Sequence, residues 1–154
     1  MSVPASQRYT STVQYLKTVK DVTKAVHKIY RKLNAHYKQD LGRWLCDLAR
    51  SAEINANKVN SVYANNLHKM KMKQEYLTEA IASTKALLTE VDDLYDNEIK
   101  HDITNSFGQT IHAVDPLVKP GLIAEVIKQA EKSLAMLLGV QKKLDKQWKE
   151  QPES

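Results

Sequence analysis

One short motif in the chain has the residue types and the spacing of a metal site. Glu98 and His101 form a Glu-x-x-His pair, which would place a carboxylate and an imidazole on one face of a helix. Helical bundles that hold two metal ions between carboxylates use two such motifs together with two further glutamates. The second motif is absent, and Glu98 lies at the expected end of a helix, so we expect neither a metal nor a cofactor.

The sequence contains no recognisable catalytic motif. It has no GxSxG, no glycine-rich phosphate loop and no HExxH. Cys46 is the only cysteine, which excludes an intramolecular disulfide and a multi-cysteine zinc site, and its leucine neighbours favour a buried structural thiol. The remaining histidines are scattered and are expected at the surface or near helix ends: His27, His36, His68 and His112. We therefore expect a protein that is not an enzyme.

The side chains best suited to bind a ligand are cations at helical spacing. Five of them recur at steps of three or four residues, which places them along one face of a helix: Lys17, Lys20, Lys24, Lys28 and Arg31. Like charges at this spacing repel one another by roughly 0.2–0.5 kcal/mol per pair unless an anion lies nearby. The stripe is either the solvated exterior of a helix or a surface for phosphate groups, and the sequence leaves both readings open.

Charge is distributed unevenly along the chain, whose formal net charge is +5. Residues 1–73 carry 14 Lys or Arg against 4 acidic residues, residues 74–119 carry 3 against 9, and residues 120–154 carry 6 against 5. This asymmetry indicates an anionic partner for one surface and a basic neighbour for another, and in an oligomer the two surfaces could meet. No apolar run is long enough to span a membrane, and the N-terminus lacks the apolar core of a signal peptide, so we expect a cytoplasmic protein.

Hydrophobic periodicity predicts one all-α domain of four long helices, over residues 11–33, 38–63, 67–96 and 122–149. Residues 1–9 are expected to form a loose arm, residues 97–121 a long connection, and residues 150–154 a frayed tail. Short connections between the first three helices favour antiparallel neighbours, and hence an antiparallel up-down four-helix bundle.

Each predicted helix carries an apolar stripe of residues that we expect to be buried. In the first helix the stripe consists of Val13, Leu16, Val19, Val22, Val26, Ile29 and Leu33, and in the second of Leu41, Leu45, Leu48, Ala52, Ala56, Val59 and Tyr63. In the third helix it consists of Leu67, Met70, Leu77, Ile81, Leu88, Val91 and Tyr95. In the fourth it consists of Ile123, Val126, Ile127, Ala130, Leu134, Leu137, Leu138, Leu144 and Trp148.

Several positions within these helices carry more specific expectations. Gly42 is tolerable in a helix if a neighbouring backbone packs closely against it, and Trp44 is expected to anchor the packing. Asn55 either hydrogen-bonds across the bundle and fixes its register or is a partly exposed amide without a role. The third helix has basic residues at its N-terminal end and acidic residues at its C-terminal end. Both placements oppose the helix dipole and suggest that each end has a partner.

Four segments of the chain together have the pattern of a known protein family. They are MSVPxSxR at the start, DLARSAEINANKVNSVY at residues 47–63, QEYLTEAIASTKALL at residues 74–88, and AEVIKQAEKSLAMLLG at residues 124–139. In these segments the chain resembles the accessory variability determinant family of diversity-generating retroelements. After Met136 the chain departs from the family pattern, because Leu137 and Leu138 are followed by Gly139 and Val140 where relatives tend to carry Gly or Ala and then Trp.

This resemblance implies a non-enzymatic accessory protein that forms a ring, typically a pentamer, and binds a reverse transcriptase and template RNA through basic surfaces. The residues expected to contact RNA or DNA phosphates are Lys17, Lys20, Lys24, Lys28, Arg31, Arg43 and Arg50. Two other classes remain open: a structural helical oligomer or protein-interaction bundle without a nucleic-acid role, and a metal-dependent bundle enzyme using Glu98 and His101.

Overall fold

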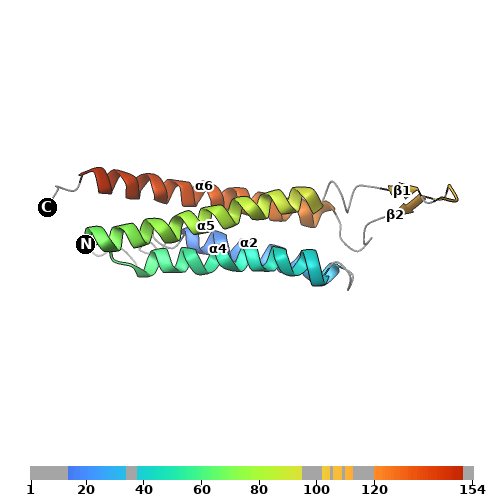
Figure 1. The fold of residues 1–154 in the computed structure, drawn as a ribbon, viewed down its shortest axis with the longest axis horizontal. Helices are drawn as coiled ribbons and strands as arrows, with labels where there is room; N and C mark the ends of the chain where they lie inside the picture. The colour runs from blue at the N-terminus through green and yellow to red at the C-terminus, as the bar shows by residue number, and fades with distance from the viewer. Residues whose placement is uncertain are drawn as a thin grey trace, which may run out of the picture.

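A computed structural model describes residues 14–33, 38–94, 102–104, 106–108, 110–112 and 120–150. Four long helices account for most of these residues: α2 (Gln14–Lys32), α4 (Arg43–Ser61), α5 (Leu67–Asp93) and α6 (Pro120–Glu150). A single π-helical turn, η1 (Lys38–Gly42), leads into α4. The helices lie side by side along one axis (Figure 1).

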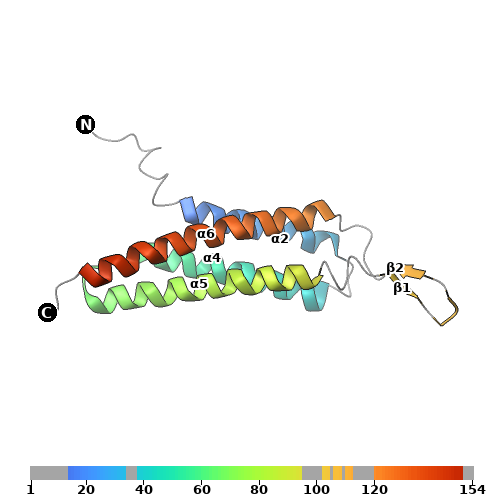
Figure 2. The same ribbon diagram turned by 90° about the horizontal axis from the view of Figure 1, so that it is seen from above.

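The four helices form an antiparallel up-down bundle. Helix α2 packs against α4 and α6, and α5 packs against the same two helices, so the four enclose one central core. Residue pairs between α4 and α5 run in opposite directions: Ser51 meets Ser83, and Lys58, which is further along α4, meets Tyr76, which is earlier in α5. Figures 1 and 2 show the same alternation for all four helices. The predicted all-α four-helix bundle is confirmed.

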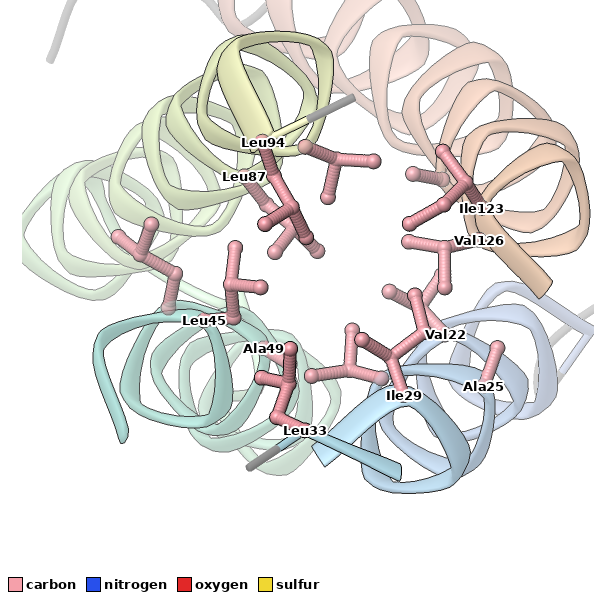
Figure 3. Close-up of a cluster of buried hydrophobic side chains, with 14 residues drawn as sticks. Val22, Ala25, Ile29, Leu33, Leu45, Ala49, Leu87, Leu94, Ile123 and Val126 are labelled. Atoms are coloured by element: carbon pink, nitrogen blue, oxygen red, sulfur yellow. The ribbon is translucent and has the colours of Figure 1, made fainter. Parts of the chain in front are cut away.

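The apolar stripes meet between the helices in two clusters of buried side chains. The first lies toward the end where α2 finishes and α4 begins, and Figure 3 shows its side chains pointing into the space between all four helices. This cluster includes Val22, Val26, Ile29, Leu33, Leu45, Ala49, Leu87, Val91, Leu94, Ile123, Val126 and Ala130. The second lies toward the other end and includes Tyr15, Val19, Ala52, Ala56, Val59, Leu77, Ala80, Ile81 and Leu137. Most of the predicted stripe residues are therefore confirmed as core.

Five residues predicted to be buried are exposed, and those predictions are wrong. They are Trp44 (49% exposed), Tyr63 (83%), Leu67 (42%), Leu138 (39%) and Trp148 (37%). Tyr63 lies beyond Ser61, where α4 ends, and Leu67 is the first residue of α5, so neither has a helical turn on both sides to direct it inward. Trp44 lies about 100° around the helix from the buried Leu45, which turns it toward the surface. Val13 and Tyr95 fall outside the described residues.

The second helix is not continuous from residue 38 as predicted. Its first five residues form η1, and regular α-helix begins at Arg43. Gly42 sits at this junction, where a Cβ atom would lie 2.9 Å from Cδ2 of Tyr30 and 3.0 Å from Cδ1 of Leu33. The close neighbours are thus side chains of the segment ending α2, rather than the neighbouring backbone that the sequence suggested. Glycine here lets the end of α2 approach the start of α4.

The charged side chains at both ends of helix α5 oppose the helix dipole. The side chain of Asn66 caps the N-terminus by accepting a hydrogen bond from the backbone N–H of Lys69 at 2.8 Å, so the first turn contains His68 and Lys69. At the other end the last turn contains Glu90, Asp92 and Asp93. The predicted placement of charge at the two ends therefore holds in the folded chain, at a cost of up to ~1 kcal/mol per charge.

The connection between α5 and α6 contains a β-hairpin, where the sequence predicted only a long connection. Strands β1 (Asp102–Thr104) and β2 (Thr110–His112) pair antiparallel, with Ile103 opposite Ile111. Gly108 in the turn has a φ of 77°, a conformation that side chains disfavour. Figures 1 and 2 show the hairpin beyond the end of the bundle. The available signal was the pair of β-branched segments on either side of this glycine.

One buried hydroxyl in the core provides a test of the packing. Ser133 is 1% exposed, and its Oγ has no hydrogen-bond partner in the part of the chain that the structure describes. Leaving a buried hydroxyl unpaired costs roughly 1–3 kcal/mol, so we expect Ser133→Ala to raise the free energy of unfolding by about 1 kcal/mol. Urea denaturation followed by circular dichroism measures this change.

The matched control for Ser133→Ala is Thr84→Ala. Thr84 is equally buried, but its hydroxyl donates a hydrogen bond to the carbonyl oxygen of Ala80 at 2.8 Å. This second variant loses a satisfied hydroxyl and a packed methyl group, so it should not be more stable than the parent protein. A loss of stability on Ser133→Ala would contradict the assignment of an unpaired hydroxyl.

Candidate nucleic-acid interface

All seven residues predicted to contact phosphates are exposed. The five cations of α2 lie on the side of the helix that faces away from its buried residues Val19, Val22 and Val26, and the two arginines lie on α4. Helices α2 and α4 are neighbours in the bundle, so the question is whether their cations share one surface.

A first hollow joins the cations of α2 to the flank of α4. It has a volume of about 430 Å³ and is lined by Lys20, Thr23, Lys24, His27, Lys28, Arg31 and Glu53. Two of its lining residues join the helices by a hydrogen bond, in which the Thr23 hydroxyl donates to Oε2 of Glu53 at 2.9 Å. Four of the five predicted α2 cations therefore border one concave surface. Lys17 does not line it, although it lies on the same side of the helix.

A second hollow continues the first toward the start of α4. It has a volume of about 350 Å³ and is lined by His27, Tyr30, Arg43, Cys46, Asp47 and Arg50. His27 lines both hollows, so the two predicted arginines of α4 lie on the same continuous surface as the cations of α2. We call the residues that line the two hollows the α2–α4 face.

The α2–α4 face is strongly positive. It brings together six cationic side chains and only two carboxylates, Asp47 and Glu53. The Glu53 carboxylate is already engaged by the Thr23 hydroxyl. At the edge of the face, Nζ of Lys38 lies 5.6 Å from the centre of the Tyr30 ring and adds a further positive charge. Charges of one sign along a concave surface concentrate their field, and such a surface attracts polyanions.

Some residues of this face could not be recognised from the sequence. His27 was expected at the surface without a role, and Asp47 and Glu53 were not weighed against the cations. The spacing of Thr23, His27 and Tyr30 along α2 shows that they share a flank, but only the position of α4 shows that this flank is the floor of a groove. The aromatic ring of Tyr30 is half-buried and lies under Lys38, so the face offers no open ring for base stacking.

Cys46 lines the second hollow and is half-buried, so it is less enclosed than predicted. Burial raises the pKa of its thiol above the ordinary value, as does the negative charge of Asp47, whereas Arg50 acts in the opposite direction. A raised pKa means less thiolate at a given pH, because the neutral thiol is favoured in the folded protein.

We expect Cys46 to be alkylated slowly in the folded protein. Near pH 8 its reaction with iodoacetamide should be at least about threefold slower than in the unfolded chain, and the rate should keep rising at pH values where a free thiol has levelled off. Intact-protein mass spectrometry at a series of pH values measures these rates, with the same protein in concentrated urea as the control. Equal rates in the two conditions would contradict a shielded, high-pKa thiol.

Two further expectations from the sequence concern a metal site at Glu98 and His101 and the lack of a membrane span. Glu98 and His101 lie outside the described residues, so the Glu-x-x-His motif is not placed by the structure. Among the described residues there is no group of three His, Cys, Asp or Glu side chains that could hold a metal ion. Nor does any described helix combine the length and apolar character needed to cross a membrane.

Comparison of the chain with protein-family models, with curated proteins and with solved structures finds no match. What the protein does is therefore inferred from the bundle, from the α2–α4 face and from the resemblance in four segments of the sequence.

Proposed function

We propose that this protein is a non-enzymatic accessory protein that binds nucleic acid through the α2–α4 face. The observation that carries the proposal is the continuity of two hollows that share His27 and gather cations from two helices. Phosphate groups are the ligands that such a surface suits, since lysine and arginine side chains can each neutralise a phosphate without reading the base. Binding through this face is expected to be strong at low salt and independent of sequence.

The nature of the assembly comes from the resemblance to accessory variability determinants. By that analogy the protein acts in the cytoplasm beside a reverse transcriptase, binds the template RNA of a diversity-generating retroelement, and assembles as a ring, typically a pentamer. The antiparallel bundle supports the analogy at the level of the fold. The polymerase partner and the ring are parts of the proposal that the resemblance alone supplies.

Fluorescence anisotropy with a labelled structured RNA tests the proposal. Protein whose molar mass has been checked by light scattering is titrated into the RNA at several salt concentrations. We expect the logarithm of the affinity to fall steeply with the logarithm of the salt concentration, by ~0.9 for each phosphate contacted in a duplex. Light scattering should give about five times the mass of one chain. Absence of binding at low salt would refute the nucleic-acid role.

A structural helical oligomer is the second candidate function. It is favoured by large apolar side chains on the outside of the bundle, among them Trp44, Ile54 and Leu138. Contacts between copies would cover these side chains. In that case light scattering would show a closed oligomer, and the anisotropy titration would show no affinity for RNA at physiological salt.

A further inference from the structure

The end of the bundle where α5 begins and α6 finishes is also strongly basic. Within residues 67–75 and 140–149 the chain carries seven lysines against two acidic residues. Helices α5 and α6 run together at this end, opposite the end from which the hairpin projects (Figure 2). We call the following residues the basic end: His68, Lys69, Lys71 and Lys73 of α5, and Lys142, Lys143, Lys146 and Lys149 of α6.

Contacts between helices fix which residues share a level at this end. The side chain of Gln74 donates a hydrogen bond to Oδ1 of Asp145 at 3.2 Å. Because α5 and α6 are antiparallel, moving three residues back from Gln74 to Lys71 corresponds to moving three residues forward from Asp145. The side chain at that level of α6 is Trp148.

A second aromatic residue, from the segment that follows α4, lies at about the same level of the bundle as Lys71. Nζ of Lys58 in α4 lies 5.3 Å from the centre of the Tyr76 ring in α5. Moving five residues back from Tyr76 to Lys71 corresponds to moving five residues forward from Lys58, which reaches Tyr63 just beyond the end of α4. Lys71 therefore lies at about the level of two exposed aromatic side chains that come from the two neighbouring segments.

These aromatic side chains differ from the core in their exposure. Tyr63 is 83% exposed, and Trp148 is 37% exposed although it is among the largest apolar side chains of the protein. Exposed aromatic rings among lysines are the combination by which proteins hold unpaired nucleotides, since bases stack on the rings while cations contact the phosphates. The α2–α4 face lacks such open rings. Helix α4 rises about 12 Å from Glu53, which lines the α2–α4 face, to its last residue Ser61, and Tyr63 lies beyond that end, so the two surfaces are separate.

We propose that the basic end is a second nucleic-acid site, which takes unpaired nucleotides by stacking bases on Tyr63 and Trp148. This inference rests on the proposed function only in taking nucleic acid as the partner, because none of its residues belongs to the α2–α4 face. Lysines at the start of α5 oppose the helix dipole, and phosphate groups at this end offset that repulsion. The bundle thereby offers one surface for the backbone of any nucleic acid and another for single-stranded segments.

Tryptophan fluorescence reports the stacking directly. The chain has two tryptophans, so Trp44→Phe leaves Trp148 as the only one. Titrating this variant with a 12-nucleotide oligouridine is expected to quench Trp148, whereas inorganic polyphosphate, which supplies charge without bases, should not. The converse variant, Trp148→Phe, leaves Trp44 as a control whose emission should change little. An unquenched Trp148 at saturating oligouridine would overturn the proposal.

Affinity measurements with aromatic variants complete the test. The double change Tyr63→Ala and Trp148→Ala is expected to weaken oligouridine binding about tenfold or more and to change the affinity for a 12-base-pair duplex by less than about twofold. Because Trp148 is partly buried, the double change Tyr63→Phe and Trp148→Phe serves as the conservative control, and it should bind like the parent protein. Equal oligouridine affinity for all three proteins would overturn the proposal.

The outcomes separate this proposal from the one for the α2–α4 face. Suppose that the change of Lys20, Lys24 and Lys28 to Glu does not alter duplex binding, and that oligouridine still quenches Trp148 in this variant. The site at the basic end is then supported, and the site on the α2–α4 face is refuted. If that change abolishes duplex binding while oligouridine does not quench Trp148 in the parent background, the α2–α4 face is supported and the site at the basic end is refuted. A lower molar mass for the Tyr63→Ala and Trp148→Ala protein by light scattering would identify this end as a contact between copies and overturn the proposal.

Discussion

Replacing Lys20, Lys24 and Lys28 together with Glu is expected to lower the affinity for structured RNA by about 100-fold or more at ~0.1 M salt. All three lysines are exposed and line one hollow of the α2–α4 face. A salt slope of ~0.9 per duplex phosphate contact corresponds to roughly eightfold in affinity per contact at this salt concentration, and three contacts are lost together. The slope itself should become shallower by about three units. Anisotropy titrations over a salt series measure both quantities.

The control for this variant carries the same change in charge elsewhere on the bundle. Lys85, Lys128 and Lys132 are exposed residues of α5 and α6 that border neither the α2–α4 face nor the basic end. Their replacement by Glu lowers the net charge by the same amount, so a general electrostatic effect would appear in both proteins. A similar loss of affinity in the two variants would contradict a local site on α2 and α4.

Leu45→Ala is expected to lower the free energy of unfolding by ~2–5 kcal/mol, because it removes a buried side chain from between the helices. Leu45 is 1% exposed and belongs to the larger core cluster, where Figure 3 shows it directed inward from α4. Alanine preserves the helix, so the loss reports packing rather than propensity. Urea or thermal denaturation followed by circular dichroism measures the change.

The matched control is the preceding residue. Trp44 is the larger side chain, and sequence reasoning assigned it the anchoring role, yet it is 49% exposed. We expect Trp44→Ala to change the free energy of unfolding by less than about 1 kcal/mol. A larger loss from Trp44→Ala than from Leu45→Ala would contradict the orientation of α4 in the bundle.

The number of helices and most of the core could be predicted because apolar residues recur every three or four residues along each helix, which is the period of an α-helix. Val19, Val22, Val26 and Ile29 all lie on one side of α2 and are all buried. Periodicity locates the inward side of a helix but does not show where the helix stops. Tyr63 continues the pattern of α4 and nevertheless lies past its end, which is why it is exposed.

Hydrogen bonds between helices were less predictable than the core. Asn55 was expected either to bond across the bundle or to be a partly exposed amide. In the structure its Nδ2 donates to the carbonyl oxygen of Ser51 at 2.9 Å, within its own helix. The bond across α4 and α5 is instead made by the hydroxyls of Ser51 and Ser83, 2.9 Å apart. Serine is common in helical sequences, so nothing in its spacing distinguishes these two from serines that face solvent.

The α2 part of the candidate site could be predicted from the sequence, whereas the groove that α2 forms with α4 could not. The step of three or four residues from Lys20 to Arg31 places these cations on one face from the sequence alone. That spacing gives an angle around one helix and says nothing about the neighbouring helix. The contributions of His27 and Glu53 appear only when α4 is placed beside α2, as does the absence of Lys17 from the hollows.

Lysine protection by RNA is the most direct test of the α2–α4 face as the surface that holds nucleic acid. The protein is acetylated briefly with and without saturating duplex RNA, and the extent of modification at each lysine is compared by peptide mass spectrometry. We predict that Lys20, Lys24 and Lys28 are protected by RNA, while Lys85, Lys128 and Lys132 are modified equally in both samples. Full reactivity of the three α2 lysines in the RNA-bound protein would contradict the account.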